Sequence, residues 1–240
     1  MLSKTIYKML CVSVFSLSFV YAQQCEKDKC DYGHIGIGGG HYELSAHDVK
    51  SYVGYLSLEH RGVYKHRFQT ALGGRIGEGS SQSPSNGVFI FDFYAKLGLN
   101  IASASTPLFI NVFVEDSTYN GKIKEGSDLS RDFILLGLEA DGYIPLSRLT
   151  YFDYGIGYGW IGSANYILND TRFKVQGKNN ESFQAHIGFS RHINDNTLYY
   201  INLIGKYQRT NATNTINNMS YPHSRDMIIM LEVGIKGFDK

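Results

Sequence analysis

Two short stretches carry the residue types that a hydrolase would need. His223 and Ser224 are adjacent and Asp226 follows closely, while His47 precedes Asp48. A serine, a histidine and an acid can form a nucleophilic site in which the histidine takes the hydroxyl proton and the acid orients the histidine. Adjacent side chains of an extended segment point to opposite sides, so His223 and Ser224 would not face each other. The sequence therefore predicts no catalytic residues.

The histidines and cysteines lack the spacing that metal binding and redox chemistry require. The 8 histidines are scattered, with no H-x-H or H-x-x-x-H cluster beside an acid, so neither a metal nor another cofactor is expected. Cys25 and Cys30 have four residues between them, which is not the C-x-x-C spacing of a redox motif. In an exported chain this spacing favours a disulfide between Cys25 and Cys30 that closes a small loop.

A larger group of polar residues alternates with apolar ones, as in Val88–Asn100, where Asp92 and Lys96 lie opposite Phe91 and Phe93. The residues expected to line a barrel lumen are Glu59, Arg75, Asp92, Lys96, Glu139, Asp141, Asp153, His186, Lys206 and Glu232. Both signs of charge are present, and an unpaired buried charge is costly, so we expect these groups to pair and to plug the lumen. A narrow ion- or solute-conducting path lined by the same residues is the alternative.

β-Strands, in which successive side chains point to opposite faces, would position these polar side chains. A strand of roughly 9–11 residues, apolar on one side and polar or glycine on the other, is typical of a transmembrane antiparallel β-barrel. About ten strands are expected, with eight or twelve left open. Their ranges are Tyr32–Leu44, Ser51–Arg61, His66–Ile76, Val88–Asn100, Leu108–Glu115, Phe133–Ile144, Thr150–Gly162, Ser182–His192, Leu198–Gln208 and Met227–Phe238.

The connections between these strands alternate in length. The short ones are Arg61–Lys65, Ile101–Pro107, Pro145–Leu149 and Ile193–Thr197, and Ser45–Lys50 is intermediate. The long ones, rich in Ser, Asn, Gly and Asp, are Gly77–Gly87, Asp116–Asp132, Ser163–Glu181 and Arg209–Asp226. With a periplasmic N-terminus, every short connection falls on the periplasmic side and every long one outside, as in outer-membrane barrels.

Aromatic residues and glycines occupy particular positions along the predicted strands. Aromatic residues near strand ends are expected to form girdles at the two membrane surfaces: Tyr64, Tyr143, Tyr151, Phe152, Trp160, Tyr199, Tyr200 and Tyr207. Gly155, Gly157 and Gly159 fall on the inward face, where they would leave room for larger side chains of neighbouring strands.

The N-terminus has the pattern of a secretory signal. Lys4 and Lys8 precede an apolar stretch, and Val20-Tyr21-Ala22 offers a cleavage site. We expect residues 1–22 to be a cleaved signal peptide, 23–31 a periplasmic segment with the cysteine pair, and 32–240 the barrel. The formal net charge of +1 gives no reason to expect a nucleic-acid partner.

Three segments carry a resemblance to a known group: the signal ending at Ala22, the glycine-rich strand Tyr32–Gly40 and the C-terminal strand Met230–Phe238. Together with the strand pattern, they resemble the small bacterial outer-membrane β-barrels of the opacity/OmpX/OmpA-barrel-like group. In that group the C-terminal residue is usually aromatic, whereas Asp239 and Lys240 follow Phe238 here.

The resemblance implies a location in the outer membrane of a Gram-negative cell. It also implies contact with outer-membrane lipid and lipopolysaccharide, insertion by the outer-membrane assembly machinery, and a monomer by default. A structural or surface-interaction role, adhesin- or opacity-like, is expected, with a host or surface ligand of the long loops left open. A lipid-modifying enzyme is the second alternative to that role.

Overall fold

The computed structural model describes residues 29–82, 87–122, 127–177 and 179–238. Their elements are β1 (Lys29–Leu44), η1 (Ser45–His47), β2 (Val49–Tyr64), β3 (Phe68–Ser81), β4 (Gly87–Asn100), β5 (Leu108–Lys122), β6 (Asp128–Pro145), β7 (Thr150–Leu168), β8 (Thr171–Lys174), β9 (Glu181–Asn194), β10 (Thr197–Thr210) and β11 (Ser224–Phe238). No helix within these ranges is long and apolar enough to cross a membrane. The predicted signal peptide and Cys25 lie outside the described residues, so the Cys25–Cys30 disulfide stays a prediction.

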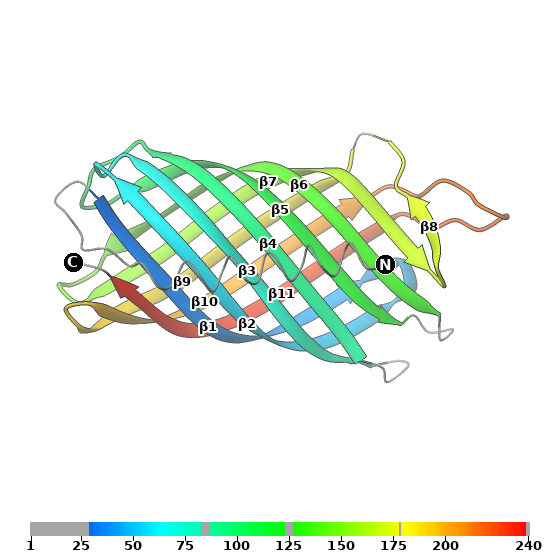
Figure 1. Ribbon diagram of the computed structural model, residues 1–240, viewed down its shortest axis with the longest axis horizontal. Coiled ribbons are helices and arrows are strands. Elements are labelled where there is room, and N and C mark those ends of the chain that lie inside the picture. The colour runs from blue at the N-terminus through cyan, green and yellow to red at the C-terminus, as the bar shows by residue number, and fades with distance from the viewer. Residues whose placement is uncertain (1–28, 83–86, 123–126, 178, 239–240) are drawn as a thin grey trace.

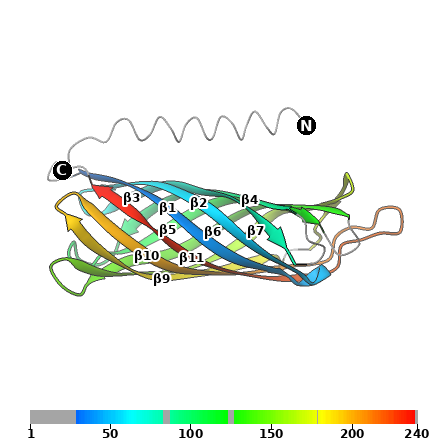
Figure 2. The same ribbon diagram turned by 90° about the horizontal axis from the view of Figure 1, so that it is seen from below.

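Ten of the strands close an antiparallel barrel, which confirms the expected fold class and strand number. Each strand pairs with its neighbours in chain order, β6 joins β7, and β7 joins β9. The first and last strands complete the ring, in register from Tyr32↔Phe238 to Leu44↔Asp226, and lie side by side in Figure 2. The short strand β8 stands outside the ring and pairs with β7 alone. Closure gives the backbone groups of all ten strands a partner, as a membrane interior requires.

The two ends of the barrel differ in their connections (Figure 1). The short-turn end carries residues 65–67, 101–107, 146–149 and 195–196, together with the start of β1 and the end of β11. The long-loop end carries residues 45–48, 82, 127, 169–177, 179–180 and 211–223, of which 171–174 form β8. The long and short connections therefore sort by end as predicted. Two predicted loops are mostly strand, however, because β3 continues to Ser81, β5 to Lys122 and β6 begins at Asp128.

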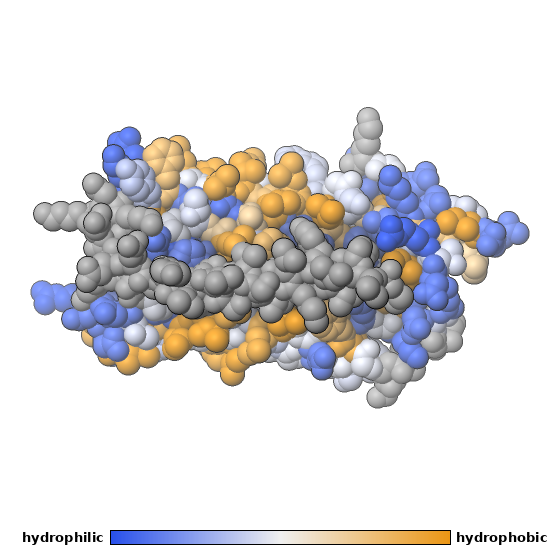
Figure 3. Space-filling view, viewed as in Figure 1, coloured by the Kyte–Doolittle hydropathy of each residue, from blue (hydrophilic) through white to orange (hydrophobic). Residues whose placement is uncertain are grey.

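The outer surface of the barrel is apolar around its middle. Ile37 is 60% exposed, Leu97 67% and Leu136 56%, and Figure 3 shows the apolar band between hydrophilic ends. Large apolar side chains on the outside of a closed ring are stabilised by lipid and not by water.

The predicted aromatic girdles are correct only in part. Tyr64, Trp160, Tyr199 and Tyr207 are 40–50% exposed on the outer surface, as expected. Three other tyrosines do not belong to a girdle. Tyr200 is 1% exposed and bonded to Glu232 inside the barrel, and Tyr143 and Tyr151 line the lumen cavity. Alternation explains the error, because Tyr199 and Tyr200 are neighbours on one strand and must face opposite sides.

Strand β6 shows how the inner and outer faces exchange character along the barrel. Toward the short-turn end, Leu136 and Leu138 face outward and Glu139 is buried inside. Toward the long-loop end the inward side chains include Leu129 and Phe133, at 2% and 0% exposure, and the outward residues Ser130 and Asp132 are polar. Along β6 the segment nearer the short-turn end is therefore apolar outside and polar inside, whereas the segment nearer the long-loop end begins with polar residues outside and apolar ones inside, as in a water-soluble protein.

A bulge in β7 marks the same transition. The pairing between β6 and β7 passes from Leu135↔Ile161 to Ile134↔Ser163 and skips Gly162. One extra residue in a strand reverses which face the following side chains occupy. Ala164 and Tyr166 are therefore buried beyond the bulge, where the sequence pattern predicts that the strand has already ended.

Candidate functional site

The predicted lumen residues come together in the half of the barrel nearer the short-turn end. Nine of the ten line one cavity, and Asp92 is buried beside it at 5% exposure.

The glycines predicted to face inward make room for side chains of neighbouring strands, as expected. A Cβ on Gly155 would meet the ring of His186, one on Gly157 would lie 3.0 Å from Cγ of Gln184, and one on Gly159 would lie 3.2 Å from Cζ of Phe113.

Ion pairs join strands that are not neighbours and so tie opposite walls of the lumen together. Arg61 of β2 contacts Asp141 of β6 with Nη1 to Oδ2 at 2.8 Å. Lys206 of β10 contacts Glu115 of β5 with Nζ to Oε1 at 2.6 Å. Further pairs are Lys96–Glu139 at 2.5 Å, Lys236–Asp153 at 3.2 Å and Arg75–Glu232 at 3.5 Å. The expected charge pairing is therefore present among the residues of this half.

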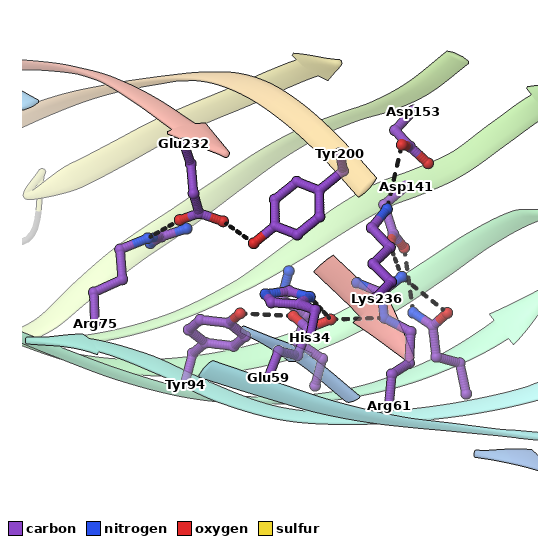
Figure 4. Close-up of polar contacts among 12 residues, drawn as sticks. His34, Glu59, Arg61, Arg75, Tyr94, Asp141, Asp153, Tyr200, Glu232 and Lys236 are labelled. Carbon is purple, nitrogen blue, oxygen red and sulfur yellow. Dashed lines mark hydrogen bonds and ion pairs between the residues drawn. The ribbon is translucent and has the colours of Figure 1, made fainter. Parts of the chain in front are cut away.

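The carboxylate of Glu59 is a centre of this network (Figure 4). Its Oε2 accepts a 2.6 Å hydrogen bond from the hydroxyl of Tyr94, and its Oε1 lies 3.0 Å from Nε of Arg61 and 3.7 Å from Nδ1 of His34. Sequence reasoning missed Arg61, although it lies two residues after Glu59 and therefore on the same face of β2.

The ion pairs line a cavity of about 460 Å³ and do not fill it. Its wall reaches the short turns, where His66, Ala104 and Pro107 border it. At the opposite limit its lining includes Phe113 and Ile204, which are also part of the apolar cluster beyond. The lumen is therefore hollow and polar toward the short-turn end.

The other half of the lumen is filled by what we call the apolar layer. Its buried members come from most of the strands and from the 169–180 and 211–223 loops: Tyr42, Leu44, Val49, Val53, Tyr55, Val88, Ile90, Phe113, Tyr119, Leu129, Phe133, Leu135, Ile161, Ala164, Tyr166, Phe173, Val175, Ile204, Tyr221, Ile228 and Met230. Rings meet across the lumen, as between Tyr42 and Tyr119, with centroids 6.1 Å apart. Tyr221 stacks on Tyr166 at 3.7 Å. Aromatic contacts of this kind stabilise a dense interior, and the sequence pattern does not predict this layer.

One ion pair is embedded in the apolar layer. Nη1 of Arg131 lies 2.7 Å from Oδ2 of Asp226, with side chains 1% and 2% exposed. The Arg131 guanidinium also lies over the ring of Phe133, 4.7 Å from its centroid, an attractive arrangement for a desolvated cation. Ser224 donates a hydrogen bond to the other oxygen of Asp226.

Two of the candidate catalytic residues, Ser224 and Asp226, take part in these contacts. Ser224 and Asp226 are buried and bonded to each other, while the preceding residue His223 is exposed. A histidine so placed cannot take a proton from Ser224. Asp48 caps the η1 turn in a left-handed conformation, with φ of 49°. Across the described ranges, no group of three or more His, Cys, Asp or Glu side chains is arranged to hold a metal ion.

The two longest loops are fastened to each other. Val175 and Thr213 form an antiparallel bridge, and the backbone N–H of Lys174 donates to Oδ1 of Asn214 at 2.7 Å. Beyond this point the 211–223 loop turns back on itself through an Ile216↔Met219 bridge and extends past β8, at the right of Figure 1. The long loop predicted over Arg209–Asp226 therefore contains a hairpin held by hydrogen bonds.

No family model matches the chain, and no curated protein sequence matches it. Solved structures match it along most of its length. The outer-membrane protease OmpT of Escherichia coli has a TM-score of 0.55 at 11% identity, covering 89% of this chain and 97% of OmpT. The translocator domain of the autotransporter NalP of Neisseria meningitidis has a TM-score of 0.52 at 10% identity, covering 98% and 97%. Identities this low show the fold alone, and the chain accordingly has the fold of a ten-stranded outer-membrane β-barrel.

Proposed function

We propose that this protein is a non-conducting outer-membrane barrel that presents its long-loop end as a surface for interaction. The apolar layer is the observation that carries the proposal. A channel needs a continuous aqueous path, whereas buried rings and the Arg131–Asp226 pair occupy the lumen beneath the long loops. In this account the apolar layer is structural, and neither a catalytic step nor a cofactor is involved.

The shape of the long-loop end supports a surface role. Binding residues often lie on loops held by a rigid scaffold. The 169–180 and 211–223 loops are held by Val175↔Thr213 and by the stack of Tyr221 on Tyr166. The tip then offers Met219, 55% exposed, between polar neighbours. Export through a signal peptide at 1–22 and a Cys25–Cys30 disulfide belong to the same proposal, because an exported chain reaches the oxidising compartment in which disulfides form.

Cells that produce the protein test this role. The unaltered chain is compared with a variant in which residues 216–219 are replaced by Gly-Ser repeats, and adhesion to coated surfaces and cell aggregation are measured. We expect the unaltered chain to increase one of these and the variant to lose the effect while it still shows heat-modifiable migration on gels. Equal behaviour of the two, together with increased solute uptake, would favour a channel instead.

A further inference from the structure

One wall of the lumen cavity carries hydrogen-bonding side chains that lie outside the ion-pair network. Gln184 and His186 of β9 and Asn202 of β10 line this wall. Among the side chains that the structure describes, these three take part in no hydrogen bond or ion pair, and Oδ1 of Asn202 is buried without a partner. Buried polar groups normally have a partner, so such a cluster indicates a missing ligand or ordered water.

Glycines allow these three side chains to lie along the wall. A Cβ on Gly155 would meet the His186 ring, one on Gly157 would meet Gln184, and one on Gly188 would meet Oδ1 of Asn202. Larger residues at these positions would push the amides and the imidazole into the lumen. The glycines thus keep the cavity open beside the three polar groups.

The remaining walls select against a charged ligand. The carboxylate of Asp141 is held by Arg61 at 2.8 Å, and that of Glu139 by Lys96 at 2.5 Å. Every acidic and basic side chain of these pairs already has its counterion. A charged ligand would have to displace one of them or enter the site without a counterion, which is costly.

We propose that this cavity binds a small neutral saccharide that enters from the short-turn end. Primary amides and an imidazole each offer a donor and an acceptor, which match a hydroxyl that also donates and accepts. Phe113 and Ile204 give an apolar limit against which the C–H face of a sugar ring packs. The volume of about 460 Å³ lies within the range of small-molecule pockets, roughly 300–1,000 Å³.

Calorimetric titration of the full chain, folded in a detergent without a sugar head group, tests the site. The probes are glucose and maltose, compared with the charged analogues glucosamine and glucose 6-phosphate. We expect saturable binding of at least one neutral probe and about tenfold weaker binding of its charged analogues. Absence of saturable binding by both neutral probes, or equal binding of the charged analogues, would overturn the proposal.

Variants assign the binding to the wall. Gln184→Leu and Asn202→Leu should each weaken binding about tenfold, since one lost hydrogen bond of about 1.4 kcal/mol corresponds to that factor. Gln208→Leu is the matched control, because Gln208 is a buried inward amide of β10 that lies outside the cavity. An equal loss in Gln208→Leu would contradict the assignment. If a leucine variant fails to fold, the comparison of neutral with charged sugars on the unaltered chain still decides, and neither readout depends on conductance or on the loop tip.

Discussion

Arg131 of β6 and Asp226 of β11 form an ion pair inside the barrel, although their strands are not neighbours. The pair links opposite walls within the apolar layer, where water cannot solvate a charge left alone. Removal of one partner from such a pair typically costs about 3–5 kcal/mol. We therefore expect Asp226→Ala to lower the free energy of unfolding by about that amount, measured by urea titration in lipid vesicles.

The exposed pair Lys122–Asp128 is the matched control for this effect. Its side chains are 42% and 77% exposed and 3.6 Å apart, so Asp128→Ala should cost about 0–1 kcal/mol. Replacing both buried partners, as Arg131→Met with Asp226→Leu, should cost less than Asp226→Ala alone because no charge stays unpaired. An Asp226→Ala variant as stable as Asp128→Ala would show that the ion pair is not buried.

The exchange of inner and outer character along β6 gives a second prediction. Leu136 faces outward in the apolar band, whereas Ser130 faces outward on the same strand near the long-loop end. Leu136→Lys should destabilise the protein by up to about 4 kcal/mol, because it places a charge in lipid, and Ser130→Lys should have little effect. Unfolding of both variants in vesicles measures this difference, and equal losses would contradict the assigned position of the membrane.

Close packing at the inward glycines of β1 gives a third prediction. A Cβ on Gly36 would meet the hydroxyl of Tyr200 and lie 2.6 Å from Oγ of Ser57, whereas one on outward-facing Gly39 would lie 3.9 Å from its nearest neighbour, a backbone oxygen of Val53. Overpacking of this kind costs about 1–3 kcal/mol. Gly36→Val should therefore reduce the fraction of heat-modifiable protein after refolding, and Gly39→Val should not. A normal yield for Gly36→Val would mean that Tyr200 points elsewhere.

The sequence predicts the barrel well where one rule holds along most of a strand. From Phe91 to Asn100 apolar residues alternate with polar, amphipathic or small ones, and β4 spans Gly87–Asn100, although its first inward residues, Val88 and Ile90, belong to the apolar layer. The same rule identifies the charged residues of the cavity, because a membrane strand tolerates a charged side chain on its lumen face and is destabilised by one on its lipid face.

The prediction fails where the rule reverses. Beyond Glu115 the strand continues with three successive polar residues, Asp116, Ser117 and Thr118, so the alternation is lost and the pattern predicts a loop over Asp116–Asp132. Gly162 is predicted as a strand end, although it is a bulge that shifts the phase. The apolar layer is missed for this reason, since Tyr119 and Tyr166 lie in segments that the pattern assigns to loops. The fastening of the two long loops depends on contacts distant in sequence, which no local pattern reveals.

Protease accessibility tests the orientation of the barrel. Arg172 and Lys174 are exposed on the β8 hairpin at the long-loop end, and Arg148 is exposed in a short turn. Trypsin added to intact cells should cut after Arg172 or Lys174 and leave Arg148 intact, because short turns of such barrels face the periplasm. Permeabilised cells, in which all three become accessible, provide the control. Cleavage after Arg148 in intact cells would contradict the orientation.

Planar-bilayer conductance tests the closed lumen most directly. The account predicts no stable open steps for the unaltered chain, because the apolar layer blocks any continuous aqueous path, and it predicts that steps appear when Tyr119, Phe133 and Tyr166 are all replaced by alanine in protein that still inserts. Stable open steps of the unaltered chain that shift with Asp92→Ala or Lys96→Ala would contradict it, since ions would then pass along the charged wall and through the layer.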